Sequence, residues 1–282
     1  MYRKVKQILT ARPASDGAGV KLNRVFGGGQ SSKDFDPFLM LDEFGSDEAA
    51  DYIAGFPSHP HRGFETVTYM LNGKMMHEDH MGNKGLLNSG DVQWMTAARG
   101  IIHSEMPQQE AGLMRGFQLW VNLPASEKMK DPHYQDIPAE KISETDLEGA
   151  VVKVIAGEVN LSDKRIAGPV KGISTQPLFL DVHLAENSEI DIPLENGHTA
   201  FIYVYENEVT LGEENTQVNA FDVALLNGEG SAKVRAKSRS KFILLSGKPI
   251  GEPIAQYGPF VMNSTEEIEQ AIQDYRSGTL TN

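Results

Sequence analysis

Short apolar runs bounded by turn residues recur along most of the chain. Such runs occupy residues 65–71, 114–123, 177–184 and 199–211. Runs of this kind, with glycine, proline and asparagine near their ends, are typical of strands, and helical spacing is scarce. Asn72-Gly73 follows the first run and predicts a hairpin turn, because both residues tolerate a positive φ angle. The pattern therefore predicts an all-β sandwich or barrel.

One helix is predicted close to the end of the sequence, over residues 263–278. Ser264 and Glu267 have the spacing of a capping box, in which each residue satisfies a free amide of the other. An apolar stripe follows at Ile268, Ile272 and Tyr275. This single stripe indicates that the helix docks on a sheet.

The two halves of the chain are weakly similar. TVTYMLNGKM resembles AFIYVYENEV 134 positions later, and SGDVQWM resembles AFDVALL 131 positions later. The intervening stretch, 126–149, is more polar and contains two prolines. We therefore expect an N-terminal domain over 1–135, a linker over 136–149 and a C-terminal domain over 150–282 that ends in the predicted helix.

Composition and charge narrow the possible functions. The 282 residues carry a net charge of −13, which disfavours nonspecific binding of nucleic acid. The absence of cysteine excludes disulfides, thiol nucleophiles and cysteine-bound zinc. The N-terminal sequence MYRKVKQILT has no long apolar core, and no apolar run reaches the length of a membrane span. A cytoplasmic protein is therefore expected, and any metal must be held by histidine, aspartate or glutamate.

Two pairs of possible metal ligands have their members one residue apart: His59 with His61, and His103 with Glu105. Alternate residues of a strand lie on the same face, so each pair can point in one direction. Two neighbouring strands with such pairs can surround one ion, and imidazole suits iron, copper, nickel and zinc. One His-x-His pair often arises by chance, but two pairs in strand context favour a metal site over surface histidines.

Three further residues near these pairs leave alternatives open. Glu65 has the same parity as His61, and is either a rival ligand or a carboxylate that orients a histidine. His77 and His80 are three residues apart, and therefore on opposite faces of a strand. We expect neither of them to be a ligand, although one could line the cavity.

The second half lacks equivalent ligands. In the internal alignment Pro193 replaces His59, and Thr199 replaces Glu65. Val234 and Ala236 replace His103 and Glu105. We therefore expect one transition metal in the chain, in its N-terminal half, and a metal-free second barrel.

Several long segments resemble the pirins, a family within the bicupins. They are FLMLDEFG, HPHRGFETVTYML, HEDHMGNKG, GDVQWMTAARGIIHSEMP, FQLWVNLPASEKM and QYGPFVMNSTEEIEQAI. The resemblance extends over nearly the whole chain. It implies two cupin barrels, or double-stranded β-helices, face to face, with one mononuclear metal in the N-terminal barrel.

The resemblance also implies a site and an activity. The pirin ligand pattern falls on His59, His61, His103 and Glu105. It implies Fe(II), or another divalent transition metal, and the opening of flavonols such as quercetin with O2. Glu105, or else Glu65, would accept the proton of the flavonol 3-hydroxyl group.

The general cupin pattern is matched only in part. His59, His61 and Glu65 fit its first motif, but the second motif expects a proline that TAARGIIH lacks. A typical cupin would use Glu65 as a ligand, whereas the pirin pattern uses Glu105. We follow the pirin pattern because it matches more closely.

A regulatory role is the alternative, because some pirins are implicated as partners of regulators or metabolic enzymes. An enzyme needs an open cavity at the metal, whereas a metal- or redox-responsive switch can be closed. Arg62 and Arg99 flank the ligand pairs, and either have a structural role or form a positive edge that attracts anionic ligands. We expect a monomer that takes a flavonol-like substrate and O2, with no direct nucleic acid contact and no membrane contact.

Overall fold

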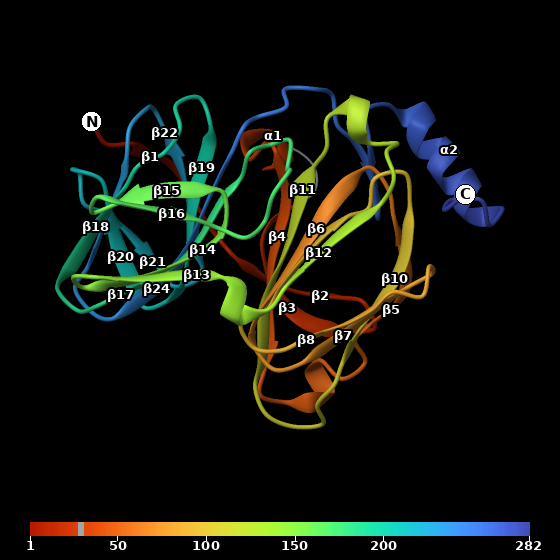
Figure 1. Ribbon diagram of the computed structural model, residues 1–282, viewed down its shortest axis with the longest axis horizontal. Coiled ribbons are helices and arrows are strands. Elements are labelled where there is room, and N and C mark those ends of the chain that lie inside the picture. Colours follow the sequence, from red (N-terminus) through yellow and green to blue (C-terminus); the bar gives the residue numbers. More distant parts are fainter. Residues whose placement is uncertain (28–30) are drawn as a thin grey trace. The chain divides into compact units, whose positions relative to one another are not determined.

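The computed structural model describes residues 1–27 and 31–282, and strands dominate it (Figure 1). The chain divides into two compact units. The histidine unit comprises Arg12–Ser32, Phe38–Ala139 and Ile250–Asn282, and the second unit comprises Met1–Ala11, Lys33–Pro37 and Glu140–Pro249. The main passage between the units, at Ala139–Glu140, falls inside the expected linker. The two ends of the chain are exchanged relative to the expectation: Met1–Ala11 belongs to the second unit, and Ile250–Asn282 belongs to the histidine unit.

The expected linker, 136–149, is mostly regular structure. It contains the end of β12 (His133–Ile137), the 3-10 helix η3 (Ala139–Lys141) and β13 (Ser143–Leu147). β12 pairs with β9 (Val92–Thr96), and β13 pairs with β14 (Ala150–Ala156). Polar composition therefore marks edge strands in this stretch, because β12 and β13 are each at the edge of a sheet.

The histidine unit has a larger and a smaller antiparallel sheet. The larger sheet has the order β12, β9, β6 (Phe64–Asn72), β11 (Met114–Asn122), β4 (Phe38–Ser46), β3 (Val20–Gly27) and β2 (Arg12–Asp16). The smaller sheet has the order β5 (Phe56–His61), β10 (Ile101–Pro107), β7 (Met75–Asp79) and β8 (Lys84–Leu87). Phe44 and Met70 of the larger sheet pack with Met75 and Leu87 of the smaller one. The two sheets therefore face each other across a shared core.

The C-terminal part of the histidine unit forms a hairpin and a helix. The hairpin pairs β25 (Ala255–Tyr257) with β26 (Phe260–Met262), and α2 (Thr265–Arg276) follows it. The predicted capping box of Ser264 and Glu267 is present. Ile268 and Ala271 are buried with residues of β26, and Ile272 packs against them, so the helix docks on the hairpin. Tyr275, the third residue of the expected stripe, is instead 42% exposed. In the parts of the chain that the structure describes, no helix is long and apolar enough to span a membrane.

The remaining short helices lie in connections. They are α1 (Ser31–Asp34), η1 (Ala49–Asp51) and η2 (Ala125–Glu127). The prediction of a hairpin at Asn72-Gly73 is wrong, because β6 and β7 belong to different sheets. Gly73 does have a positive φ of 97° and lies at a bend of the chain. It joins the two sheets of the histidine unit instead of two paired strands.

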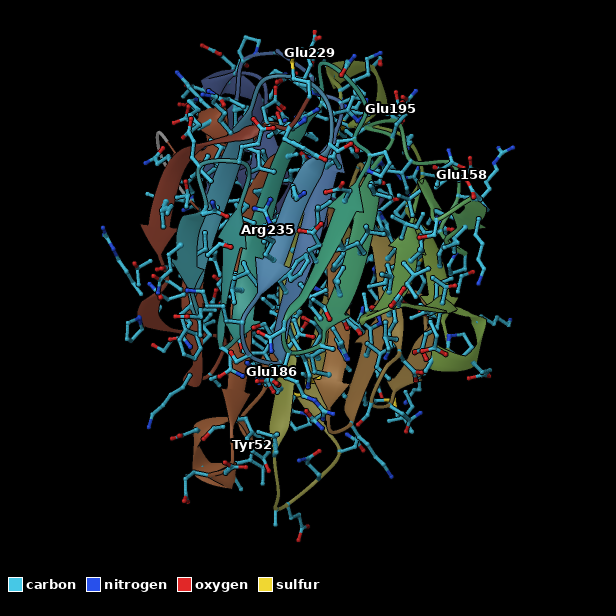
Figure 2. All side chains as sticks on the ribbon, turned by 90° about the vertical axis from the view of Figure 1, so that its left-hand side faces the viewer. Tyr52, Glu158, Glu186, Glu195, Glu229 and Arg235 are labelled. Carbon is cyan, nitrogen blue, oxygen red and sulfur yellow. The ribbon has the colours of Figure 1, made fainter. Side chains whose placement is uncertain are left out.

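The second unit also has a larger and a smaller antiparallel sheet. The larger sheet has the order β1 (Lys4–Thr10), β22 (Asp222–Asn227), β19 (Thr199–Glu206), β24 (Ser240–Gly247), β17 (Leu178–Leu184), β14 and β13. The smaller sheet has the order β18 (Ser188–Ile192), β23 (Ala232–Ala236), β20 (Glu208–Leu211) and β21 (Thr216–Asn219), and β15 (Glu158–Leu161) pairs separately with β16 (Lys164–Ala167). Polar side chains such as Arg235 cover the exposed face of the smaller sheet (Figure 2).

The interior of the second unit is apolar. Aliphatic side chains of both its sheets, with Phe242, form one buried cluster. Val234 and Ala236, which replace two of the expected ligands, belong to this cluster and are at most 3% exposed. The two positions therefore contribute to packing in this unit. Together, the two units confirm the all-β architecture with a C-terminal helix.

Candidate metal centre

Three of the predicted ligands meet on two paired strands of the smaller sheet in the histidine unit. β5 and β10 are antiparallel neighbours, and their register places His59 directly opposite His103. His61 lies two residues after His59, so both side chains are on one face. Ligand atoms of these three histidines all lie within 4.8 Å of one another. His61 and His103 are buried, whereas His59 is partly exposed.

The nitrogen atoms of this group fit a bound cation. His59 Nδ1 lies 2.8 Å from the Pro57 carbonyl oxygen, which only accepts hydrogen bonds, so Nδ1 carries the proton. His59 Nε2 is then a bare lone pair, and it lies 3.0 Å from His61 Nε2. Two nitrogens each about 2.1 Å from one ion, at right angles, would have about this separation. His103 Nε2 is buried and has no hydrogen-bond partner among the described residues.

Burial keeps the inner histidines neutral. Desolvation, with a smaller effect of His59, lowers the pKa of His61 well below its ordinary value. Desolvation, followed by the neighbouring His61 and His59, lowers the pKa of His103 in the same way. Neutral imidazole is the form that binds a metal, so this environment favours a cation over protons.

Glu105 lies in the same region but outside the compact group. Its side chain and that of His103 share the buried face of β10. The Thr68 hydroxyl group, on the facing larger sheet, donates a hydrogen bond of 2.9 Å to Glu105 Oε1. The group of ligand atoms within 4.8 Å contains the three histidines alone in the described part of the chain. Glu105 as the fourth ligand remains a prediction.

Glu65 does not join the site. Its carboxylate accepts hydrogen bonds from Trp94 Nε1 (3.1 Å) and Thr96 Oγ1 (2.6 Å). Both partners are on β9, so the carboxylate is bound on the larger sheet. The parity argument fails because the chain leaves β5 after His61 and bends at Gly63, whose φ is 91°. Alternation does not continue through such a bend.

His77, which was expected to be no ligand, contacts His103 directly. β7 is the second neighbour of β10, and His77 Nε2 lies 2.7 Å from His103 Nδ1. His77 is 1% exposed. His80 lies beyond the end of β7, where its Nδ1 accepts a hydrogen bond of 3.3 Å from the Ile102 amide. Met75, His77 and Asp79 occupy every second position of β7, but the sequence does not reveal that β7 pairs with β10.

Both flanking arginines form ion pairs. The Arg62 side chain is 5% exposed and pairs with Asp274 at 2.6 Å. Arg99 pairs with the exposed Asp131 at 2.8 Å. Neither arginine lines the cavity beside the histidines. Arg62 therefore has the structural role that was one of the two alternatives. Arg62 and Arg99 do not form a positive edge on the cavity.

A cavity of about 760 Å³ opens beside the histidines. His59, His61 and Glu105 line one part of it. Aromatic side chains line another part, among them Phe44, Phe56 and Trp120. Arg24 and Asp42 add a polar region, in which the guanidinium group binds both carboxylate oxygens at 2.9 and 2.8 Å. The volume of the cavity and its mixed apolar and polar lining are typical of a small-molecule site.

Comparison with known proteins identifies the family. The family model described as Pirin matches residues 19–121, and the model described as Pirin C-terminal cupin domain matches residues 179–281. A Pseudomonas aeruginosa protein, whose name provisionally assigns it a quercetin 2,3-dioxygenase activity, is 53% identical over 99% of this chain and 98% of its own length. The chain belongs to the pirin family. Human pirin is 42% identical, over 98% of this chain and 93% of its own.

Solved structures extend the similarity to the fold. A quercetin 2,3-dioxygenase from Acinetobacter baumannii is 33% identical to this pirin, with a TM-score of 0.91 and 99% coverage of each chain. The Pirin model lies within the N-terminal half of the chain and the Pirin C-terminal cupin domain model within the C-terminal half, and the solved structure shares the fold of the whole chain, so both domains are of the cupin type. The expected pair of cupin domains is confirmed.

Proposed function

We propose that this pirin is an iron-dependent dioxygenase that opens flavonols such as quercetin with O2. The observation that carries the proposal is the open cavity beside three convergent histidines. A closed site would favour a switching or structural ion, whereas this cavity admits a small molecule. The dioxygenase names of two similar proteins support the same activity.

The cavity suits a flat aromatic substrate. Its volume of about 760 Å³ lies within the range of about 300–1,000 Å³ that small-molecule sites have. Phe44, Phe56 and Trp120 supply ring faces and edges for contact with aromatic rings. The polar groups of Arg24 and Asp42 supply hydrogen-bond partners for hydroxyl groups.

Each residue of the site then has a defined task. His59, His61 and His103 would hold the ion, and we propose Glu105 as a further ligand. Bound iron would supply Lewis acidity toward a substrate oxygen, and the electron-rich flavonol itself would supply the electrons that O2 accepts. The Glu105 carboxylate lines the cavity and accepts the proton of the substrate hydroxyl group. The Thr68 hydroxyl group holds this carboxylate in place through Oε1.

The test combines metal analysis with an aerobic assay on one preparation. Iron-loaded protein is mixed with quercetin, and the absorbance of quercetin, the uptake of O2 and the release of carbon monoxide are followed together. We expect the three signals to change in equal amounts. A variant with His59→Ala and His103→Ala, treated with iron in the same way, is the control for reactions of free iron.

Two results would contradict the proposal. The first is no O2 uptake by iron-loaded protein with quercetin or related flavonols. The second is equal turnover by the double-histidine variant, since the reaction would then not depend on the site. In either case the metal-responsive interaction protein becomes the better hypothesis.

A further inference from the structure

The two residues that follow His61 are held by the C-terminal hairpin of the histidine unit. The Arg62 amide donates to the Pro259 carbonyl (3.3 Å), and the Val261 amide donates to the Arg62 carbonyl (3.0 Å). Gly63 lies so close to this strand that a Cβ atom on it would collide with the Val261 carbonyl oxygen. The end of β5 is therefore packed directly against β26, with no room for a side chain between them.

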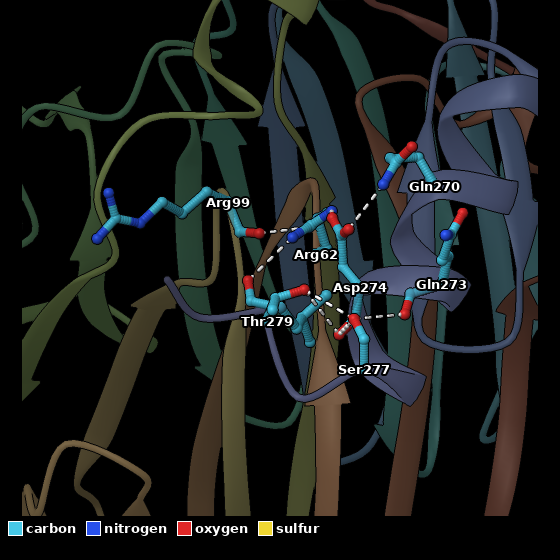
Figure 3. Close-up of polar contacts among 8 residues, drawn as sticks. Arg62, Arg99, Gln270, Gln273, Asp274, Ser277 and Thr279 are labelled. Carbon is cyan, nitrogen blue, oxygen red and sulfur yellow. Dashed lines mark hydrogen bonds and ion pairs between the residues drawn. The ribbon is translucent and has the colours of Figure 1, made fainter.

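The Arg62 side chain extends this contact to α2 (Figure 3). Its Nη1 donates to Asp274 Oδ2 (2.6 Å), its Nη2 donates to the Leu280 carbonyl (2.9 Å), and its Nε donates to the Arg99 carbonyl. Gln270 Nε2 donates to the other Asp274 oxygen at 2.7 Å. The guanidinium group is thus held at three points, and Asp274 supplies the only negative charge among these partners.

A buried lysine holds the same junction from a different direction. Lys128 Nζ donates to the carbonyls of Gly63 (2.7 Å) and Val261 (3.0 Å) and to Asn122 Oδ1 (2.7 Å). Lys128 is 1% exposed, and burial lowers its pKa to about 8. The amine therefore bridges the residue after Arg62 to the hairpin. The position of β5 depends on contacts with a segment nearly 200 residues away in the sequence.

Loss of the Asp274 charge would disturb this arrangement. A buried guanidinium group without its partner is strongly unfavourable, so the chain would move to rehydrate it. Arg62 follows His61 directly, and its backbone is hydrogen-bonded on both sides. Movement of Arg62 therefore displaces the strand that carries His59 and His61.

We propose that Asp274 is a positioning residue for the metal site: through Arg62 it fixes the strand that presents His59 and His61. Asp274 itself lies on α2 and provides no ligand. The inference rests on the proposed function only in taking these histidines as metal ligands. It makes the C-terminal helix part of the machinery that defines metal affinity and geometry.

The test uses the full-length protein with Co²⁺ as the metal probe. Asp274→Asn removes the charge and keeps the shape of the side chain. Glu269→Gln makes the same chemical change at an exposed position of α2 and is the matched control. Affinity is measured by competition with a chelator, and the visible absorption bands of saturated Co²⁺ protein report ligand geometry. Thermal unfolding of the metal-free proteins measures stability separately.

We expect Asp274→Asn to weaken Co²⁺ binding by about tenfold or more, within the range for residues that orient ligands. We also expect altered absorption bands at saturation, with Glu269→Gln like the wild type. A lower melting temperature with wild-type affinity and bands would overturn the inference, because Asp274 would then only stabilise the fold. If Asp274→Asn does not fold, Gln270→Ala replaces it, with the same two readouts and a smaller expected change.

The two proposals fail in distinguishable ways. Wild-type protein that binds no Co²⁺ would contradict the metal site itself, and the inference on Asp274 would fail with it. Wild-type protein that binds Co²⁺ tightly, together with a variant that binds identically, would contradict the role of Asp274 alone.

Discussion

The Nε2 atom of His77 lies 2.7 Å from the Nδ1 atom of His103, and both rings are buried. This contact uses one ring nitrogen of His103 and leaves the other, Nε2, without a hydrogen-bond partner among the described residues. When His103 Nδ1 donates its proton to His77, the lone pair of His103 Nε2 is left for a metal. In that state His77 fixes both the tautomer and the orientation of a predicted ligand.

We predict that His77→Ala weakens metal binding by about 10–100-fold, the range for residues that orient ligands. His77→Gln restores part of the affinity, because an amide oxygen can accept the same hydrogen bond. Affinity for Fe(II) is measured anaerobically by competition with a chelator. His80→Ala is the control, since His80 contacts the Ile102 amide instead of a ligand. Unchanged affinity in His77→Ala would show that His103 is oriented by other contacts.

The second prediction concerns Glu105 as the base. Glu105→Gln keeps the shape of the side chain but removes its charge and basicity. Because base assistance is typically worth about 10²–10⁴-fold, turnover of quercetin falls by at least about 10² at equal iron content. Glu110→Gln, an exposed position shortly after β10, is the control. Normal turnover by iron-loaded Glu105→Gln would remove Glu105 from the mechanism.

The contrast between Glu105 and Glu65 shows where sequence reasoning holds. The i, i+2 rule correctly placed His59 with His61 and His103 with Glu105, because each pair lies within one strand. The same rule failed between His61 and Glu65, because the chain changes sheets between them. Side-chain parity is a property of one continuous strand and carries no information across a bend.

Local chemistry was sufficient for α2 but not for strand pairing. The capping box and the apolar stripe predicted the helix, because both act within a few residues. The chain bends at Gly73, but the predicted hairpin is wrong, because the partners of a strand are set by long-range packing. For the same reason the contact of His77 with His103 could not be foreseen. The exchange of the chain ends between the two units is a further long-range feature of this kind.

The third prediction concerns the pH dependence of stability. Burial, opposed by the hydrogen bonds of Thr96 and Trp94, raises the pKa of Glu65 from 4.5 to about 6. The folded state therefore binds this proton more tightly than the unfolded state. The resulting stabilisation is fully present below pH 4.5 and is lost as the pH rises through about 6. Its size is about 2 kcal/mol, since one pKa unit corresponds to about 1.4 kcal/mol.

Glu65→Gln imitates the neutral form and tests this directly. Between pH 4.5 and 7, we expect the unfolding free energy of the wild type to fall by about 2 kcal/mol more than that of the variant. Urea unfolding of the metal-free proteins at several pH values measures it. Trp94 fluorescence is a second probe, because its Nε1 donates to Glu65 Oε2. Glu269→Gln serves as the control, and identical pH dependence in wild type and Glu65→Gln would contradict the assigned pKa.

The last prediction is a stoichiometry of one tightly bound ion per chain, held by the histidine unit. In the described residues, the three histidines are the only group of ligand atoms close enough to share an ion. Val234 and Ala236, the counterparts of His103 and Glu105, are instead packed in the apolar core of the second unit. A variant with both His59→Ala and His103→Ala loses two of the three imidazoles, so we expect it to bind no metal tightly. His133→Ala with His198→Ala removes two imidazoles outside the group and retains the ion. Elemental analysis after dialysis against a chelator measures the metal content of the wild type and of both double variants. Two ions per wild-type chain would contradict the assignment, and so would one ion per chain in the variant with His59→Ala and His103→Ala.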